Sequence, residues 1–97
     1  METKEIRKIH TIIKGHIKTL ENGCLSKDER EFEVDLLRES LITLTRECKK
    51  HKKLLSTETI EKTFILRNVR DELFSYLMRN PWDSAVTSLY EDVLVNI

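Results

Sequence analysis

Residues 57–79 read TETIEKTFILRNVRDELFSYLMR and carry the widest set of apolar side chains in the chain. These side chains recur at helical spacing and cover more than half of a helix circumference. They are Ile60, Phe64, Ile65, Leu66, Val69, Leu73, Phe74, Tyr76, Leu77 and Met78. A helix of this kind is predicted to be the central, most buried element of its domain. Leu73 is predicted to be a central core residue.

The segment 3–22 is predicted to form an amphipathic helix with a narrower apolar seam. That seam consists of Ile6, Ile9, Ile13, His16 and Leu20. Gly15 interrupts the helix and indicates a bend or a close helix crossing. Asn22-Gly23 is expected to end the helix, because both residue types tolerate the left-handed conformation found just past helix ends.

A second helix is predicted over 27–54, preceded by Ser26, which forms a capping box with Glu29. Its apolar residues repeat at heptad spacing. Ser56 or Thr57 is expected to cap the helix over 57–79. A fourth helix is predicted over 81–95, with Asn80 as its cap and Pro81 at its first position.

The predicted connections are only 2 to 5 residues long, which makes consecutive helices pack antiparallel. We therefore expect an all-α fold, a compact antiparallel bundle of four helices (3–22, 27–54, 57–79 and 81–95) in one domain covering residues 1–97. Because the second helix is longer than the first, Arg46 to Lys53 should project about three turns beyond the first helix's N-terminus.

The amino-acid composition and charge exclude several classes of protein. The 97 residues are 39% apolar and 35% charged, with two glycines and one proline, which excludes disordered, collagen-like and turn-rich β proteins. The formal net charge is zero, so no global field attracts nucleic acid or an anionic membrane. The start METKEIRKIH indicates neither a signal peptide nor a membrane span, and two cysteines suit reduced thiols. We expect a cytoplasmic protein, or a nuclear one in a eukaryote.

Chemical motifs are sparse. Cys48 and His51 have a spacing that chelates zinc, but Cys24 lies at the opposite end of the predicted hairpin, so Cys48 is interpreted as a core residue. The three histidines are scattered and no glycine-rich phosphate loop occurs. We expect no enzyme, no cofactor, no metal site and no small-molecule substrate.

The sequence instead favours a small interaction module, an adaptor or regulator that binds a partner protein or itself. Trp82 either closes the end of the core or forms a binding hot spot. The stretch 93–97 is apolar on more than one face, and the helix over 57–79 has more apolar surface than one core stripe needs. The candidate binding residues are Trp82, Tyr90, Leu94 and Val95, together with the exposed part of that helix.

A basic cluster supports an alternative, a regulator associated with nucleic acid. It consists of Arg46, Lys49, Lys50, Lys52 and Lys53. Lysines in the last turns of a helix also balance its dipole, so the cluster has a structural interpretation too.

A further alternative comes from resemblance. RDELFSYLMRNPWDSAVTSLY (70–90) resembles the fourth and fifth helices of a caspase-recruitment domain of the death fold, and ENGCLSKDE (21–29) resembles the loop before that fold's third helix. Between the two matching segments, this chain has about twenty residues more than that fold. The resemblance implies an adaptor of that class.

Overall fold

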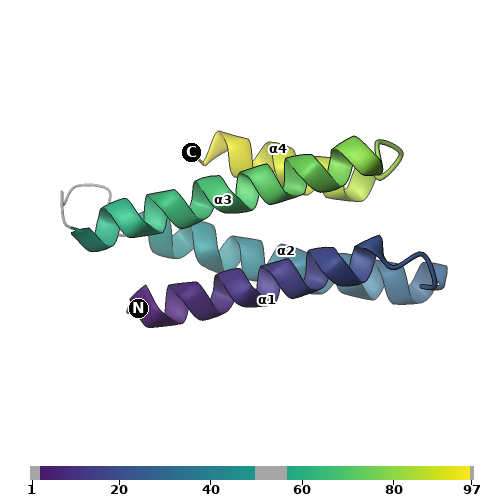
Figure 1. The fold of residues 1–97 in the computed structure, drawn as a ribbon, viewed down its shortest axis with the longest axis horizontal. Coiled ribbons are helices and arrows are strands. Elements are labelled where there is room, and N and C mark those ends of the chain that lie inside the picture. Colours follow the sequence, from purple (N-terminus) through teal and green to yellow (C-terminus); the bar gives the residue numbers. More distant parts are fainter. Residues whose placement is uncertain (1–2, 50–56, 97) are drawn as a thin grey trace.

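The computed structural model describes residues 3–49 and 57–96, with side chains for residues 4–48 and 60–96. It contains four helices, α1 (Thr3–Glu21), α2 (Lys27–Lys49), α3 (Thr57–Arg79) and α4 (Ser84–Val95). Consecutive helices run in opposite directions (Figure 1). The predicted all-α antiparallel bundle is therefore confirmed.

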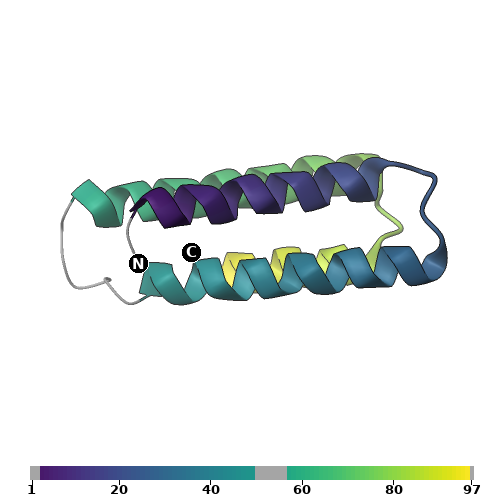
Figure 2. The same cartoon turned by 90° about the horizontal axis from the view of Figure 1, so that it is seen from below.

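The bundle is elongated, with principal extents of 43 × 21 × 16 Å. Figure 2 shows two layers, α1 with α3 and α2 with α4. In the described residues, α2 and α3 contact each other and every other helix, whereas α1 and α4 do not meet. Figure 1 accordingly shows α3 between α1 and α4, with α2 behind. Three helices therefore surround α3, and one side of it remains open.

The core runs the length of the bundle and draws apolar residues from all four helices. Leu73 has no exposed surface and lies in a buried row on α3 with Leu66, Val69 and Tyr76. The predicted seams of the other helices are also buried, for example Ile13 of α1, Leu37 of α2 and Leu89 of α4. The prediction that α3 is the most buried helix is only partly right, because Ile60, Phe64, Phe74 and Met78 are exposed.

Two predictions about the first connection have different outcomes. The capping box is confirmed: the Glu29 amide donates to Ser26 Oγ and the Ser26 amide donates to Glu29 Oε1, each at 3.2 Å. The Ser26 hydroxyl and amide lower the pKa of Glu29. The predicted end of the first helix at Asn22-Gly23 is confirmed in position, since α1 ends at Glu21, but the left-handed conformation given as its reason is not found, because no glycine in the described residues has a positive φ. The Asn22 amide instead donates to the Thr19 carbonyl at 3.1 Å and ends α1 in a tight turn.

The start of the fourth helix was predicted three residues too early. The structure places α4 at Ser84, with Asp83 as its N-cap, and Asp83 Oδ1 accepts a hydrogen bond from the Val86 amide at 3.1 Å. Asn80 serves α3 instead, because its Nδ2 donates to the Tyr76 carbonyl at 3.1 Å. Pro81 and Trp82 lie in the turn between the helices.

Arg46–Lys53 was predicted to project beyond the N-terminus of the first helix. The structure contradicts this prediction for the residues up to Cys48. Glu47 is buried, and Cys48 Sγ donates to the Lys62 carbonyl at 3.4 Å. The neighbouring Glu61 pairs with Arg7 of α1, so this part of α2 lies level with α1 and does not project beyond it. The continuation of α2 to residue 54 and the cap at Ser56 lie outside the described residues. In the described ranges, no helix has the length and apolar composition that a membrane crossing requires.

Candidate interaction surface

The open side of α3 carries a row of large apolar side chains. Ile60, Phe64, Phe74 and Met78 are 64, 63, 49 and 69% exposed. With the exposed Arg67 and Asp71 between them, they follow a 4-3-4-3-4 spacing, which keeps residues on one face of a helix. We call Ile60, Phe64, Arg67, Asp71, Phe74 and Met78 the outer stripe.

The outer stripe lies opposite the buried row of the same helix. Lys62, Leu66, Val69, Leu73 and Tyr76 follow a 4-3-4-3 spacing toward the core. Residues offset by two positions point the opposite way on a helix, since each residue turns the chain by about 100°. Helix α3 is therefore apolar on two faces, and the bundle covers only one of them.

The outward face of α2 shows that this bundle does not require an apolar exterior. Helices α2 and α3 each have 23 residues and pack against each other. The outward face of α2 has the same 4-3-4-3-4 spacing, but four of its six residues are charged. These residues are Asp28, Phe32, Asp35, Glu39, Ile42 and Arg46, of which Phe32 and Ile42 are apolar. An apolar outer stripe is thus a property of α3 and not of the fold.

Two of the predicted binding residues of α4 extend the outer stripe. The rings of Tyr90 and Phe74 have centroids 6.0 Å apart and are tilted by 40°, a favourable aromatic arrangement. Leu94 lies one turn further along the same face of α4 and is 43% exposed. The outer stripe, Tyr90 and Leu94 together form one continuous candidate surface.

Val95 belongs to a different surface. It is 85% exposed and lines a groove of about 290 Å³ between α2 and α4. Leu41, Leu89 and Val93 form the buried floor of this groove, and Ile42 forms its other wall. The four predicted binding residues therefore do not lie on a single surface.

Trp82 lies at a third place, the corner between α3 and α4. It is 64% exposed, so the interpretation that it closes the core is wrong. Its ring stacks on the guanidinium of Arg30, with Arg30 Cζ 4.5 Å from the ring centroid, which is a cation–π contact. The two side chains line a shallow cavity of about 420 Å³ with Asp83.

Arg30 also joins a polar network that connects all four helices. Arg30 Nη1 donates to the Leu20 carbonyl of α1 at 3.2 Å, and Nη2 donates to the Tyr76 hydroxyl of α3 at 2.8 Å. The Tyr76 hydroxyl donates to Asp83 Oδ2 at 2.6 Å. Burial and the Asp83 carboxylate raise the pKa of Tyr76. The network is structural, because its carboxylate, its hydroxyl and the Nη groups of Arg30 are bonded to one another, whereas the buried Arg30 Nε has no hydrogen-bond partner within the described residues.

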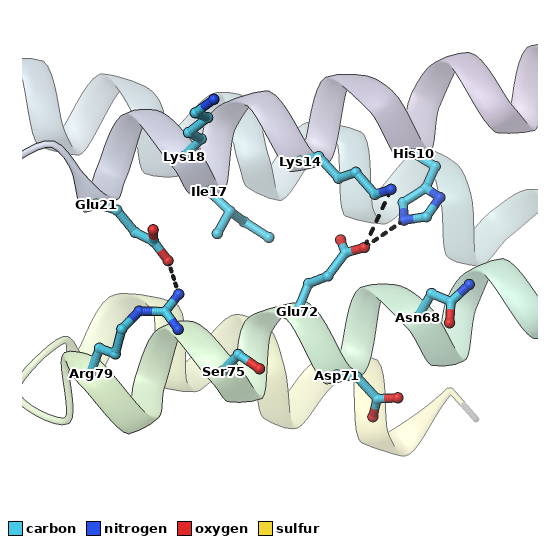
Figure 3. Close-up of a pocket in the computed structure, with 10 residues that line it drawn as sticks. All are labelled: His10, Lys14, Ile17, Lys18, Glu21, Asn68, Asp71, Glu72, Ser75 and Arg79. Carbon is cyan, nitrogen blue, oxygen red and sulfur yellow. Dashed lines mark hydrogen bonds and ion pairs between the residues drawn. The ribbon is translucent and has the colours of Figure 1, made fainter.

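A cleft of about 540 Å³ lies between α1 and α3 and is lined mainly by polar and charged side chains (Figure 3). Glu72 Oε1 accepts from His10 Nε2 at 2.9 Å and lies 3.9 Å from Lys14 Nζ. Arg79 of α3 pairs with Glu21 at the other end of the cleft. The charged residues that line the cleft therefore have a structural role, because their ion pairs hold the two parallel helices α1 and α3 together.

His16 likewise forms a pair between helices, in this case between α1 and α2. The sequence placed it in the apolar seam of α1, but it is half-buried and its Nδ1 lies 2.9 Å from Glu33 Oε2. Among the described residues, no three His, Cys, Asp or Glu side chains form a group that could hold a metal ion. His51 lies outside those residues.

Cys48 is half-buried at the edge of the core, as its core interpretation expects. Burial raises the pKa of its thiol to about 11, although the nearby positive charge of Lys62 acts in the opposite direction. Lys62 itself is 1% exposed, and within the described residues its Nζ has no hydrogen-bond partner. The burial of Lys62 was not predicted from the sequence.

The basic cluster is described only at Arg46, which is exposed near the end of α2. The side chains of Lys49, Lys50, Lys52 and Lys53 lie outside the described set. The nucleic-acid patch therefore stays a prediction.

The outer stripe itself was only partly anticipated. Surplus apolar surface on residues 57–79 was predicted, but the individual binding residues predicted were Trp82, in the turn before α4, and Tyr90, Leu94 and Val95 of α4. The missing signal was a second heptad register in residues 57–79, offset from the register of Leu66, Val69 and Leu73.

Comparison with protein-family models, with curated proteins and with solved structures gives no match. The resemblance of 21–29 and 70–90 to a caspase-recruitment domain gains no support from these comparisons and stays a prediction.

Proposed function

We propose that this chain is a protein–protein interaction module that binds through the outer stripe of α3 together with Tyr90 and Leu94 of α4. The observation that carries the proposal is the position of four large apolar side chains, 49 to 69% exposed, on the face of α3 opposite the core. Exposed apolar side chains scattered singly are ordinary, whereas several gathered on one helix face indicate a binding surface. Here they form two pairs, Ile60 with Phe64 and Phe74 with Met78, on either side of Arg67 and Asp71.

A comparison of free energies supports the inclusion of α4 residues in this binding surface. Covering the exposed part of one such side chain contributes roughly 1 to 2 kcal/mol. Association costs about 4 to 15 kcal/mol, so the four apolar residues of the outer stripe offset this cost only in part. Tyr90 and Leu94 adjoin Phe74 and add to the apolar area.

The polar groups of the structure favour binding over catalysis. The described histidines pair with Glu72 and Glu33, and Asp83 is used by Tyr76 and the α4 amide of Val86. Cys24 and Cys48 are free thiols, which suits the reducing cytoplasm as the proposed compartment. We expect binding through an apolar surface to persist at moderate salt, unlike binding of nucleic acid by the basic cluster.

Site-specific photo-cross-linking tests the proposal. A benzoylphenylalanine replaces Phe64, Phe74 or, as a control, Phe32 of α2, which is exposed to the same 63% as Phe64. Irradiation of cells that express each variant should yield protein adducts from positions 64 and 74 and few from position 32. Absence of protein adducts at 64 and 74, or equal yields at 32, would overturn the proposal.

A further inference from the structure

The residues of the outer stripe are arranged symmetrically along α3 about the level of Val69. Ile60 and Met78 lie nine residues on either side of Val69, Phe64 and Phe74 lie five residues on either side, and Arg67 and Asp71 lie two residues on either side. Each pair joins residues of matching kind, either two apolar side chains or one base and one acid. The outer stripe is therefore complementary to its own reversed copy.

From this symmetry we infer that the partner of the outer stripe is a second copy of this chain, bound with the two α3 helices antiparallel. This inference rests on the proposed function and names the occupant of its surface. A two-fold axis at the level of Val69 places Phe64 opposite Phe74 of the second copy and Ile60 opposite Met78. Such a contact is isologous, the commonest form of dimer interface.

The two central charges fix the direction of pairing. Antiparallel helices place Arg67 opposite Asp71 of the second copy, and the symmetry repeats the pair. Parallel helices would place Arg67 opposite Arg67 and Asp71 opposite Asp71, which is repulsive. In the described residues Arg67 has no ion pair, and Asp71 contacts only the neighbouring Arg70 at 3.0 Å with its carboxylate 67% exposed. Both groups are therefore accessible to a partner.

The length of the outer stripe suits a helix-to-helix contact. From Ile60 to Met78 it spans about 27 Å, at about 1.5 Å per residue. Its 4-3 spacing is the one that keeps two helices in contact at a shallow crossing angle. The same two-fold rotation places α4 on the same edge as its own copy, where Tyr90 and Leu94 can widen the interface.

The opposite face of the bundle does not offer this match. Antiparallel self-pairing of α2 about Leu37 would place Phe32 opposite Ile42, but it would also place Asp35 opposite Glu39, two acids at the centre of the contact. The outward face of α2 has these two exposed apolar residues, whereas the outer stripe of α3 has four. A second copy is therefore expected on α3 and not on α2.

Sedimentation velocity on charge-reversal variants tests the pairing. The wild-type chain should sediment as a dimer of twice its 11.5 kDa mass as its concentration rises. Arg67→Asp and Asp71→Arg each place like charges opposite one another and should raise the dimer dissociation constant about tenfold or more. An equimolar mixture of the two variants should recover wild-type affinity, because each heterodimer regains two opposite-charge pairs. Glu39→Arg, on the outward face of α2, should change nothing.

A second mixture tests the orientation. Phe64→Lys and Phe74→Glu should each weaken self-association. Mixing the two variants should restore it, because antiparallel pairing places the introduced lysine of one chain opposite the introduced glutamate of the other. Parallel pairing offers no such contact. Far-UV circular dichroism should show that every variant keeps the helical fold.

The outcomes separate this inference from the proposed function. A wild-type monomer at all concentrations up to about 500 μM, far above the dissociation constants of specific complexes, would overturn the dimer. Single variants that dimerise like the wild type, or mixtures that recover nothing, would overturn it too. If photo-cross-linking at Phe64 then captured a different protein, the interaction module would stand and the second copy would not.

Discussion

Leu73 and Met78 lie on the same helix but make contributions to stability of very different size. Leu73 has no exposed surface, whereas Met78 is 69% exposed on the outer stripe. Leu73→Ala should lower the free energy of unfolding by about 2 to 5 kcal/mol, through lost burial and a residual cavity. Met78→Ala should lower it by less than about 0.5 kcal/mol. Urea titration at low protein concentration measures both, and similar losses for the two variants would contradict the assignment of core and outer faces.

Cys48 and Cys24 should differ in reactivity. Burial raises the pKa of Cys48 from 9.0 to about 11, whereas Cys24 is exposed. The thiolate is the reactive form, so at pH 8 Cys48 should have about a hundredfold smaller thiolate fraction than a thiol with the ordinary pKa. Reaction with Ellman's reagent should give one fast and one slow thiol, with the slow phase missing in Cys48→Ser. Two equally fast thiols would refute the burial of Cys48.

The same shift implies a pH dependence of stability. Above about pH 9 the unfolded chain loses the Cys48 proton while the folded chain keeps it, because the pKa is higher in the folded state. Stability should therefore fall as the pH rises from about 9 to 11. This fall should be smaller in Cys48→Ser.

Gly15 offers a stabilising substitution. A Cβ built on Gly15 meets no atom within 4 Å, so the close helix crossing considered for this residue is absent. Gly15→Ala should raise the free energy of unfolding by about 0.5 to 1 kcal/mol, because alanine restricts the unfolded chain and favours helix. Chemical denaturation measures the change, and a loss of stability would show that the surroundings of α1 are described wrongly.

Individual side chains were predictable from sequence where helical periodicity alone decides their position. Leu66, Val69 and Leu73 were placed correctly for this reason. The partners of His10 and His16 were not predictable, because Glu72 and Glu33 come from other helices and their proximity depends on how those helices align. Lys62 was missed because a lysine at a core position has no signature in one sequence.

Helix boundaries, too, were predictable where they depend on neighbouring residues and were not predictable where they depend on tertiary contacts. Ser26 and Glu29 were identified because both partners of a capping box lie within four residues. The start of α4 was misplaced because Asn80-Pro81 has the composition of a cap and first position. Asn80 is instead engaged by α3, and Asp83 is held by the Tyr76 hydroxyl, a tertiary contact.

The corner at Asp83 yields a test of this assignment. Asp83→Ala removes the cap of α4 and leaves the Tyr76 hydroxyl and the Arg30 guanidinium without their buried carboxylate. We expect a loss of about 3 to 5 kcal/mol in the free energy of unfolding. Asn80→Ala, which alters the residue that the sequence favoured, should cost about 1 kcal/mol or less. Equal losses in denaturant titrations would contradict Asp83 as the cap.

The number and direction of the helices followed from periodicity and short connections, but their lateral order did not. Helix α1 lies beside α3 and does not meet α4 in the described residues. This arrangement depends on how wide each apolar seam is in three dimensions and on pairs such as Arg7 with Glu61, which link α1 to α3. The surplus apolar surface on residues 57–79 was recognisable in the sequence, whereas its position on the open side of the bundle required the structure.

The concentration dependence of thermal unfolding tests most directly whether the outer stripe of α3 is a binding surface and not part of the core. Association with a second copy stabilises the folded state by mass action, so the wild-type Tm should rise with protein concentration. Phe32→Glu, at an equally exposed position on α2, should keep this rise. Phe64→Glu should leave the Tm at low concentration unchanged and abolish the rise. A Phe64→Glu chain whose Tm still rises like the wild type, or falls well below it at low concentration, would contradict the assignment.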